Sequence, residues 1–187
     1  MKYWLLIITL LLTTSCANRP TQFTIDPEIN LSQLAKAKDT HIMLSIVGPQ
    51  PQAASTSEEV LLNSSNNFTS TIKQSFIKAL TKKGYKISSN KHFSDVILEL
   101  DFSNLKMAIK PGLVKDSLEA NGKLSLKLTK KPHSLSKSFS RSQTLMVAGR
   151  ANDAEVTGLA NDLIGNLLSR ALTDPQIIAF LNKPAAQ

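Results

Sequence analysis

The chain has 187 residues, of which 42% are hydrophobic and 19% are charged, so it can bury the core of one compact domain. The formal net charge is +8, but the basic residues are scattered and no aromatic residues are interleaved with them, which argues against a nucleic-acid-binding protein. The one cysteine, Cys16, has no second cysteine in the chain with which to form a disulfide. The composition therefore excludes a scaffold held together by disulfides.

Residues 1–15 have the organisation of a secretory signal peptide. Lys2 supplies a positive charge, and the apolar run from Trp4 to Leu12 follows it. This run is about half as long as the roughly 20 apolar residues that a membrane-spanning helix needs. The small residues Thr13 to Ser15 then precede Cys16, and this arrangement resembles the lipobox of bacterial lipoproteins. The alternatives are an ordinary signal peptide with an incidental cysteine and a signal anchor.

The lipobox resemblance implies that the thiol of Cys16 is alkylated with diacylglycerol and that the mature protein begins at Cys16. The diacylglycerol supplies two acyl chains and acylation of the new amino group adds a third, and stable anchoring requires two or more. Ala17 follows Cys16, where an aspartate would retain an enteric lipoprotein at the inner membrane. The resemblance thus implies an anchor in the outer membrane with the protein on its periplasmic side.

Beyond the cysteine, we expect a polar tether over residues 16–22 and a single α+β domain over residues 23–187. The segment around Pro27 is predicted to lie extended at the edge of the domain, because proline cannot donate to a strand ladder. The β-branched run from Thr40 to Gly48 predicts a strand, and a polar loop follows over residues 49–59. Apolar residues at a spacing of four, beginning at Phe68, predict a helix that ends before Gly84.

The middle of the chain alternates apolar and polar residues, as half-buried strands do. One such run covers residues 94–110, and Pro111 and Gly112 mark a turn after it. A second run covers residues 117–131, and its lysines are predicted to pair across the strands with Glu99 and Asp101. After a turn or loop over residues 131–137, a third strand is expected over residues 138–149, paired with the second as a hairpin.

Two helices complete the predicted elements. Asn152 or Asp153 caps a long helix with an apolar stripe, and Asp174 with Pro175 starts a short last helix. Because the strands cluster between helical regions, we expect an α+β fold. Its sheet is predicted to be mostly antiparallel, with about four strands and with the two main helices packed on one face.

With these elements in place, the chain resembles the YajG family of bacterial lipoproteins. The resemblance rests on Cys16 in its lipobox, on "FTIDPEI" soon after it, and on "LTKKGYKI" at the end of the first helix. It continues through "DVILELDFSNLKMAI" and the C-terminal stretch "GRANDAEVTGLANDLIGNLLSRALTDPQIIAFL", and covers roughly residues 16–183. It implies an outer-membrane lipoprotein that faces the periplasm, and it carries no catalytic signature.

The residues themselves predict no catalytic, cofactor or metal site. The three histidines lack the spacing of metal ligands, and no nucleophile motif is present. Glu99 and Asp101 lie two apart on one strand face, which suits either an acid–base pair or, as we expect, a solvated surface. Four basic residues without an acidic neighbour are candidate contacts for anionic lipid or lipopolysaccharide phosphates, or a solvated hairpin end: Lys130, Lys131, Lys137 and Arg141.

Two classes of function follow. We expect a non-enzymatic interaction or accessory module that docks on an envelope assembly, such as a secretion or cell-wall machine, through its open sheet face or sheet edge. The alternative is a protein that binds lipid or another small ligand in a groove between helix and sheet. A docking module should have a filled core and an exposed surface, whereas a ligand-binding protein should have a deep apolar pocket.

Overall fold

The computed structural model describes residues 19–182, except residues 30, 33, 35, 38, 39, 52, 55 and 57. The predicted signal peptide and Cys16 lie outside the described residues, so their assignment stays a prediction. The elements in chain order are β1 (Gln22–Phe23), β2 (His41–Val47), β3 (Val60–Leu61), β4 (Asn63–Ser64), α2 (Phe68–Lys82), β5 (Lys86–Ile87), the 3-10 helix η1 (Lys91–Phe93), β6 (Val96–Lys110), β7 (Lys115–Lys130), β8 (His133–Ala148), α3 (Asp153–Leu172) and α4 (Pro175–Asn182).

The main sheet of the described residues has six strands and mixed directions. Five strands run in the order β5-β2-β6-β7-β8, and β3 pairs with the far part of β6. β2 is parallel to both β5 and β6, whereas the pairs of β6 with β3 and β7, and of β7 with β8, are antiparallel. The prediction of a mostly antiparallel sheet of about four strands is therefore wrong. The connection through α2 carries the chain back before β6 begins, and such a helical crossover makes neighbouring strands parallel.

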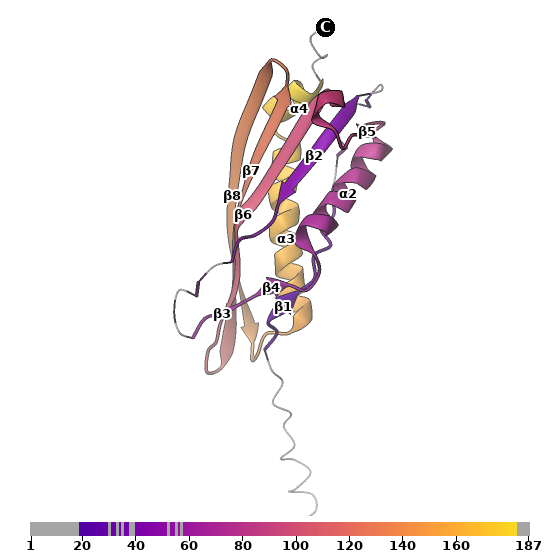
Figure 1. The fold of residues 1–187 in the computed structure, drawn as a ribbon. Helices are drawn as coiled ribbons and strands as arrows, with labels where there is room; N and C mark the ends of the chain where they lie inside the picture. The colour runs from indigo at the N-terminus through magenta and orange to yellow at the C-terminus, as the bar shows by residue number, and fades with distance from the viewer. Residues whose placement is uncertain are drawn as a thin grey trace, which may run out of the picture.

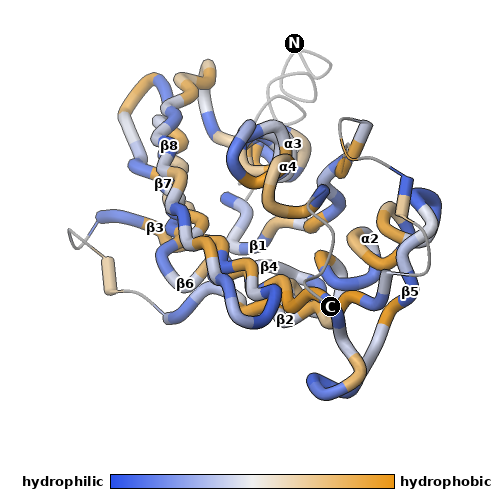
Figure 2. Tube along the Cα trace, turned by 90° about the horizontal axis from the view of Figure 1, so that it is seen from above, coloured by the Kyte–Doolittle hydropathy of each residue, from blue (hydrophilic) through white to orange (hydrophobic). Residues whose placement is uncertain are grey.

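Helices α2 and α3 cover one face of this sheet, and the opposite face is open (Figures 1 and 2). Their ends follow the sequence signals. The side chain of Asn67 accepts a hydrogen bond from Ser70 N at the start of α2, and Gly84 beyond its end has a φ of 85°. Asn152 and Glu155 form a capping box at the start of α3. Asp174 accepts hydrogen bonds from the first backbone N–H groups of α4.

Strands β6, β7 and β8 form two long hairpins whose alternation separates a helix-covered face from an open face. The register pairs Glu99 with Lys127, whose side chains form an ion pair of 3.0 Å, and it pairs Asp101 with Ser125. The predicted cross-strand ion pair is thus confirmed for Glu99. The turn between β7 and β8 is only Lys131 and Pro132, because β8 already begins at His133.

The apolar core lies between the sheet and the two long helices, and leucines of α3 pack against β7 at Gly122. A Cβ atom at Gly122 would lie 2.9 Å from Leu167 Cδ1, 3.1 Å from Leu105 Cδ1 and 3.2 Å from Leu163 Cδ2. The absent side chain is what lets the leucines of α3 reach the sheet. Gly158 and Gly165 of the same helix have no such neighbours within 4 Å of a built Cβ.

Replacing Gly122 by valine should destabilise the fold by about 1–3 kcal/mol, because the added methyl groups force α3 away from β7. The matched control is Gly158→Ala, which should stabilise α3 by up to about 1 kcal/mol because alanine favours a helix and meets nothing here. Urea unfolding of both variants measures the difference. Equal stability of Gly122→Val and the unchanged protein would contradict the packing described.

Candidate functional site

A cavity opens where β6 changes its partner along one edge. β2 pairs with β6 as far as Asp101, and β3 pairs with it only from Ala108 onward. Between these points the β6 ladder shifts its register, and Ser103 N donates to the Asp101 carboxylate at 2.7 Å. Between these points no described strand pairs with this edge of β6, and a cavity of about 480 Å³ lies there, beside the start of α2.

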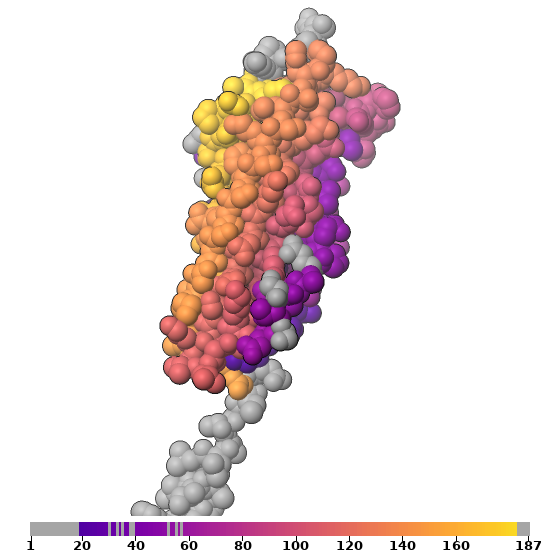
Figure 3. Space-filling model, turned by 90° about the vertical axis from the view of Figure 1, so that its left-hand side faces the viewer, coloured from indigo at the N-terminus to yellow at the C-terminus, as the bar shows by residue number. Residues whose placement is uncertain are grey.

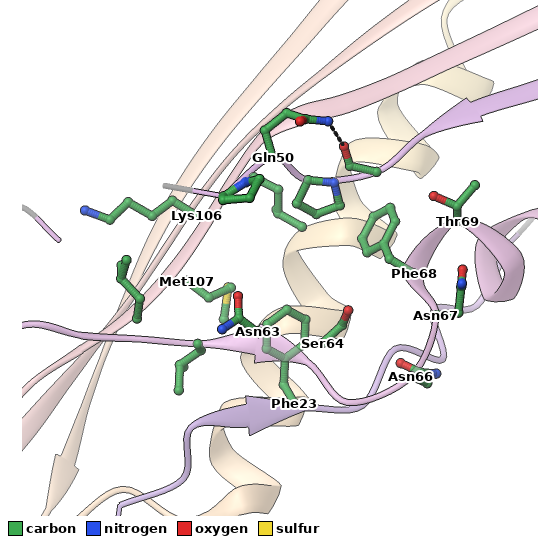
Figure 4. Close-up of a pocket in the computed structure, with 16 residues that line it drawn as sticks. Phe23, Gln50, Asn63, Ser64, Asn66, Asn67, Phe68, Thr69, Lys106 and Met107 are labelled. Carbon is green, nitrogen blue, oxygen red and sulfur yellow. Dashed lines mark hydrogen bonds between the residues drawn. The ribbon is translucent and has the colours of Figure 1, made fainter. Parts of the chain in front are cut away.

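The lining of this cavity is mixed in polarity (Figure 4). The side chains of Phe23, Phe68 and Met107 point toward its middle, and amide and hydroxyl groups surround them. The ring of Phe68 also packs edge-on against Phe102 at 5.3 Å between centroids. The side chain of Asn66 bonds both backbone groups of Ile25, which holds the N-terminal segment beside the cavity. The site is thus an open, half-polar hollow and not a deep apolar pocket.

Part of the cavity wall is formed by the loop that follows β2, and this loop is fixed at two points. Gln50 N donates to Ser103 O of β6 at 3.2 Å. At the other end, the buried carboxylate of Glu59 forms an ion pair with Lys106 at 3.0 Å. The loop predicted over residues 49–59 is therefore attached to β6 near both of its ends.

A second constellation ties the start of the described chain to the far end of β7. Arg19 donates from Nε to Asp116 Oδ2 at 2.8 Å and from its terminal NH2 to Asp116 Oδ1 at 3.0 Å. The carboxylate of Asp116 is fully buried and also accepts from Gly112 N and Ala151 N. It thus joins the N-terminal segment, the β6–β7 turn and the connection between β8 and α3.

These donors keep Asp116 ionised far below neutral pH. The Arg19 guanidinium, together with the N–H groups of Ala151 and Gly112, lowers the pKa of Asp116 to about 2, against the opposing effect of burial. Sequence reasoning did not find this residue. Its signal was the alternation of β7, because stepping back by two from the buried Leu118 places Asp116 on the same buried face.

Strand β8 forms one edge of the sheet along its full length (Figure 3). Its register with β7 runs without interruption from Ala148 to His133, and no described strand lies on its outer side. The side chains on its open face are exposed and mostly small and polar: Ser134, Ser136, Ser138, Ser140, Ser142 and Thr144. Neither a bulge nor a proline interrupts the strand, although such features commonly protect edges.

The four basic residues that were candidate contacts for an anionic surface do not form one exposed cluster. The ammonium of Lys130 is buried and donates to Leu181 O at 2.7 Å, and burial lowers the pKa of Lys130. Lys137 binds both oxygens of Asp174. Arg141 lies half-buried opposite Gly122, and Lys131 is exposed in the β7–β8 turn. Their contact with phosphates stays a prediction.

The side chains considered for catalysis or metal binding make ordinary surface contacts. Glu99 is ion-paired with Lys127 on the open face, and the carboxylate of Asp101 accepts from Ser103 N. His41 lies 3.6 Å from Asp95 at the start of β2. Within the described residues, no group of three or more His, Cys, Asp or Glu side chains is arranged to hold a metal ion. None of the described helices is long and apolar enough to cross a membrane.

Asp116→Asn should lower the free energy of unfolding by about 2 kcal/mol at pH 7, because the carboxylate that accepts from Arg19 is lost. The folded pKa of about 2 lies below the ordinary value of 3.8, so this stabilisation is complete above pH 3.8 and is lost as the pH falls through 2. The difference between variant and unchanged protein should therefore shrink over this range in urea unfolding. Glu119→Gln, which breaks the more exposed pair with Lys110, is the control and should cost at most about 1 kcal/mol.

Comparisons with solved structures give remote similarities. A homolog of the neuraminyllactose-binding hemagglutinin from Helicobacter pylori aligns with 82% of this chain and 96% of its own, at 11% identity and a TM-score of 0.44. The PelC dodecamer of Paraburkholderia phytofirmans covers 76% of this chain and 92% of its own, with 17% identity and a TM-score of 0.34. Lipoprotein GNA1162 of Neisseria meningitidis covers 70% and 99%, with 12% identity and a TM-score of 0.34. All three scores lie below 0.5.

The sequence comparison is more specific. No curated protein sequence matches the chain. A family model named Lipoprotein_16, described as "Uncharacterized lipoprotein", matches residues 52–182, which comprise β3 to α4 and thus most of the described fold. The match is consistent with the lipobox resemblance around Cys16 at the start of the chain. The chain therefore belongs to this family of bacterial lipoproteins.

Proposed function

We propose that the protein is a YajG-like lipoprotein anchored through a lipidated Cys16 in the outer membrane, where it faces the periplasm. The membership of a lipoprotein family supports the anchor. The signal-peptide pattern of residues 1–15 supports export, and Ala17 in place of aspartate supports sorting to the outer membrane.

In this location, the protein acts as a non-enzymatic docking module of an envelope assembly. The observation that supports this role is the long uninterrupted edge of β8. The backbone groups on the outer edge of a strand form a template for one more strand, and an extended segment of a partner protein gains main-chain hydrogen bonds there. Serine side chains on the open face leave room for the side chains of the added strand.

The second candidate function, binding of a small ligand, rests on the cavity at the partner change of β6. Its volume of about 480 Å³ lies within the range of small-molecule sites, but its lining is half polar and one side is open. The buried apolar residues that pack between the sheet and the helices favour the docking module. Native mass spectrometry of protein extracted from envelopes distinguishes the two, since only a ligand-binding protein carries a bound small molecule.

Photo-crosslinking along β8 tests the docking role. A photoreactive amino acid placed in turn at Ser134, Ser138 and Ser142 should capture the same envelope protein in intact cells. If a strand is added, the captured residue on the partner should move along its sequence by about four positions with each step, because paired strands advance together. The same probe at Lys73, exposed on α2, is the matched control and should capture little.

Three results would contradict the proposal. Capture from Lys73 equal to that from β8 would show no preference for the edge. Capture sites that do not advance with the probe would exclude strand addition. A product with twice the mass of the chain would identify the occupant as a second copy of this protein instead of an envelope partner.

A further inference from the structure

The turn between β6 and β7 exposes large apolar side chains at one end of the molecule. The exposed fractions of Leu113 and Val114 are 106% and 83%, so both side chains stand in solvent. Met146 and Leu145 of β8, exposed by 52% and 39%, pair with the first residues of β7 beside this turn. Two other large apolar side chains of the described residues are exposed, and one of them, Phe93, precedes β6 at the opposite end.

The same end holds the start of the described chain. Figure 1 shows β1, β3 and the β6–β7 turn together at the end opposite α4, and Figure 3 shows the turn protruding there. Arg19 is bound through two hydrogen bonds to Asp116, which lies two residues beyond Val114. The same carboxylate accepts from Gly112 N in the turn. The N-terminal segment is therefore fixed directly beside the apolar turn.

The chain length between the anchor and this contact is short. Three peptide units separate Cys16 from Arg19, and a fully extended chain of that length spans about 10 Å. If Cys16 carries lipid, as the proposed function requires, its acyl chains enter the bilayer within that distance of the backbone of Arg19, whose side chain binds Asp116 next to the turn. The apolar turn then faces the membrane and not open solvent.

Charged residues of both signs lie beside the turn, and they are compatible with a position at the membrane surface. Lys110 and Lys115 flank the turn, and long lysine side chains reach phosphate groups while their stems lie on apolar surface. Acidic residues lie in the same region, since Glu119 pairs with Lys110 and Asp153 begins α3. The contact therefore depends on Leu113 and Val114 more than on net charge, and it should persist at high salt.

We propose that the β6–β7 turn is a membrane-contacting tip, with Leu113 and Val114 inserted among the lipid headgroups beside the lipidated Cys16. Two side chains are too few to anchor a protein, so the acyl chains hold it and the tip sets its orientation. Because β8 ends beside the turn and most of its length lies farther from the membrane, its edge then projects into the periplasm. The inference rests on the proposed lipid anchor.

Lipid-dependent fluorescence quenching tests the tip. The full chain with Leu113→Cys is purified from envelopes, labelled with an environment-sensitive fluorophore and reconstituted into vesicles of phosphatidylethanolamine and phosphatidylglycerol. Mass spectrometry of the N-terminal peptide verifies the acyl chains on Cys16. Lipids with a spin label near the headgroup should reduce the emission at position 113 at least twofold. The matched control, Phe93→Cys, is also exposed but lies at the opposite end, and its emission should not change.

The outcomes separate the tip from the anchor. Acylated protein that floats with the vesicles but shows no quenching at position 113, or equal quenching at positions 113 and 93, overturns the tip and leaves the anchor standing. Protein without acyl chains on Cys16 overturns the anchor and the tip together. The crosslinking of β8 is independent of both results.

Discussion

The buried carboxylate of Asp116 organises the end of the molecule on which the proposed orientation depends. Four donor groups from three segments converge on its two oxygens: two from the Arg19 guanidinium, and the N–H groups of Gly112 and Ala151. A buried carboxylate without such donors would destabilise the folded state. The carboxylate of Asp116 has hydrogen-bond donors for both oxygens and stays ionised. The interaction connects a segment next to Cys16 to the end of the sheet across 97 positions in sequence.

The two sides of the β6–β7–β8 hairpins differ in what pairs with them. On one side, β6 exchanges β2 for β3, a cavity lies between the two pairings, and the ion pair of Glu59 with Lys106 attaches the loop before β3 to β6. On the other side, no described strand pairs with the outer edge of β8, whose register with β7 is unbroken and whose Ser140 O accepts a hydrogen bond from Arg170. Natural proteins usually protect a long edge strand from pairing with other chains, and the outer side of β8, which has no described strand, is where we propose that a partner strand pairs. The proposed tip and the proposed docking edge together would place the domain upright on the membrane, with one strand directed toward the periplasm.

Local signals predicted the helices well because their ends are determined by neighbours in sequence. The helices α2 and α3 begin at the N-caps Asn67 and Asn152, and Gly84 follows the end of α2 with a positive φ, as these residue types favour. The direction of β2 was not predictable in the same way, because alternation of apolar residues reports which face is buried and not which strand lies beside it. The two-residue strands β1, β3 and β4 carry too little pattern to be recognised, since their pairing partners hold them in place.

The burial of the polar residues at the two ends of β7 could have been predicted from the sequence. The buried series from Leu118 to Leu128 continues by steps of two to Asp116 and to Lys130, and both are buried. A strict reading of the period would have placed a carboxylate and an ammonium in the interior and required partners for them. The sequence could not identify those partners, Arg19 and the backbone of Leu181, because they lie far away along the chain.

The central claim is that the lipid anchor and the β6–β7 turn meet the membrane at one end, so that the long strands point away from it. Neutron reflectometry of the acylated protein on a supported bilayer measures this directly. We expect a protein layer that begins at the headgroups and extends about 50 Å, the length of a strand with the 16 residues of β7. A much thinner layer would mean that the domain lies flat, and a water-filled gap beneath the protein would mean that the turn does not touch the bilayer. Either result would contradict the account.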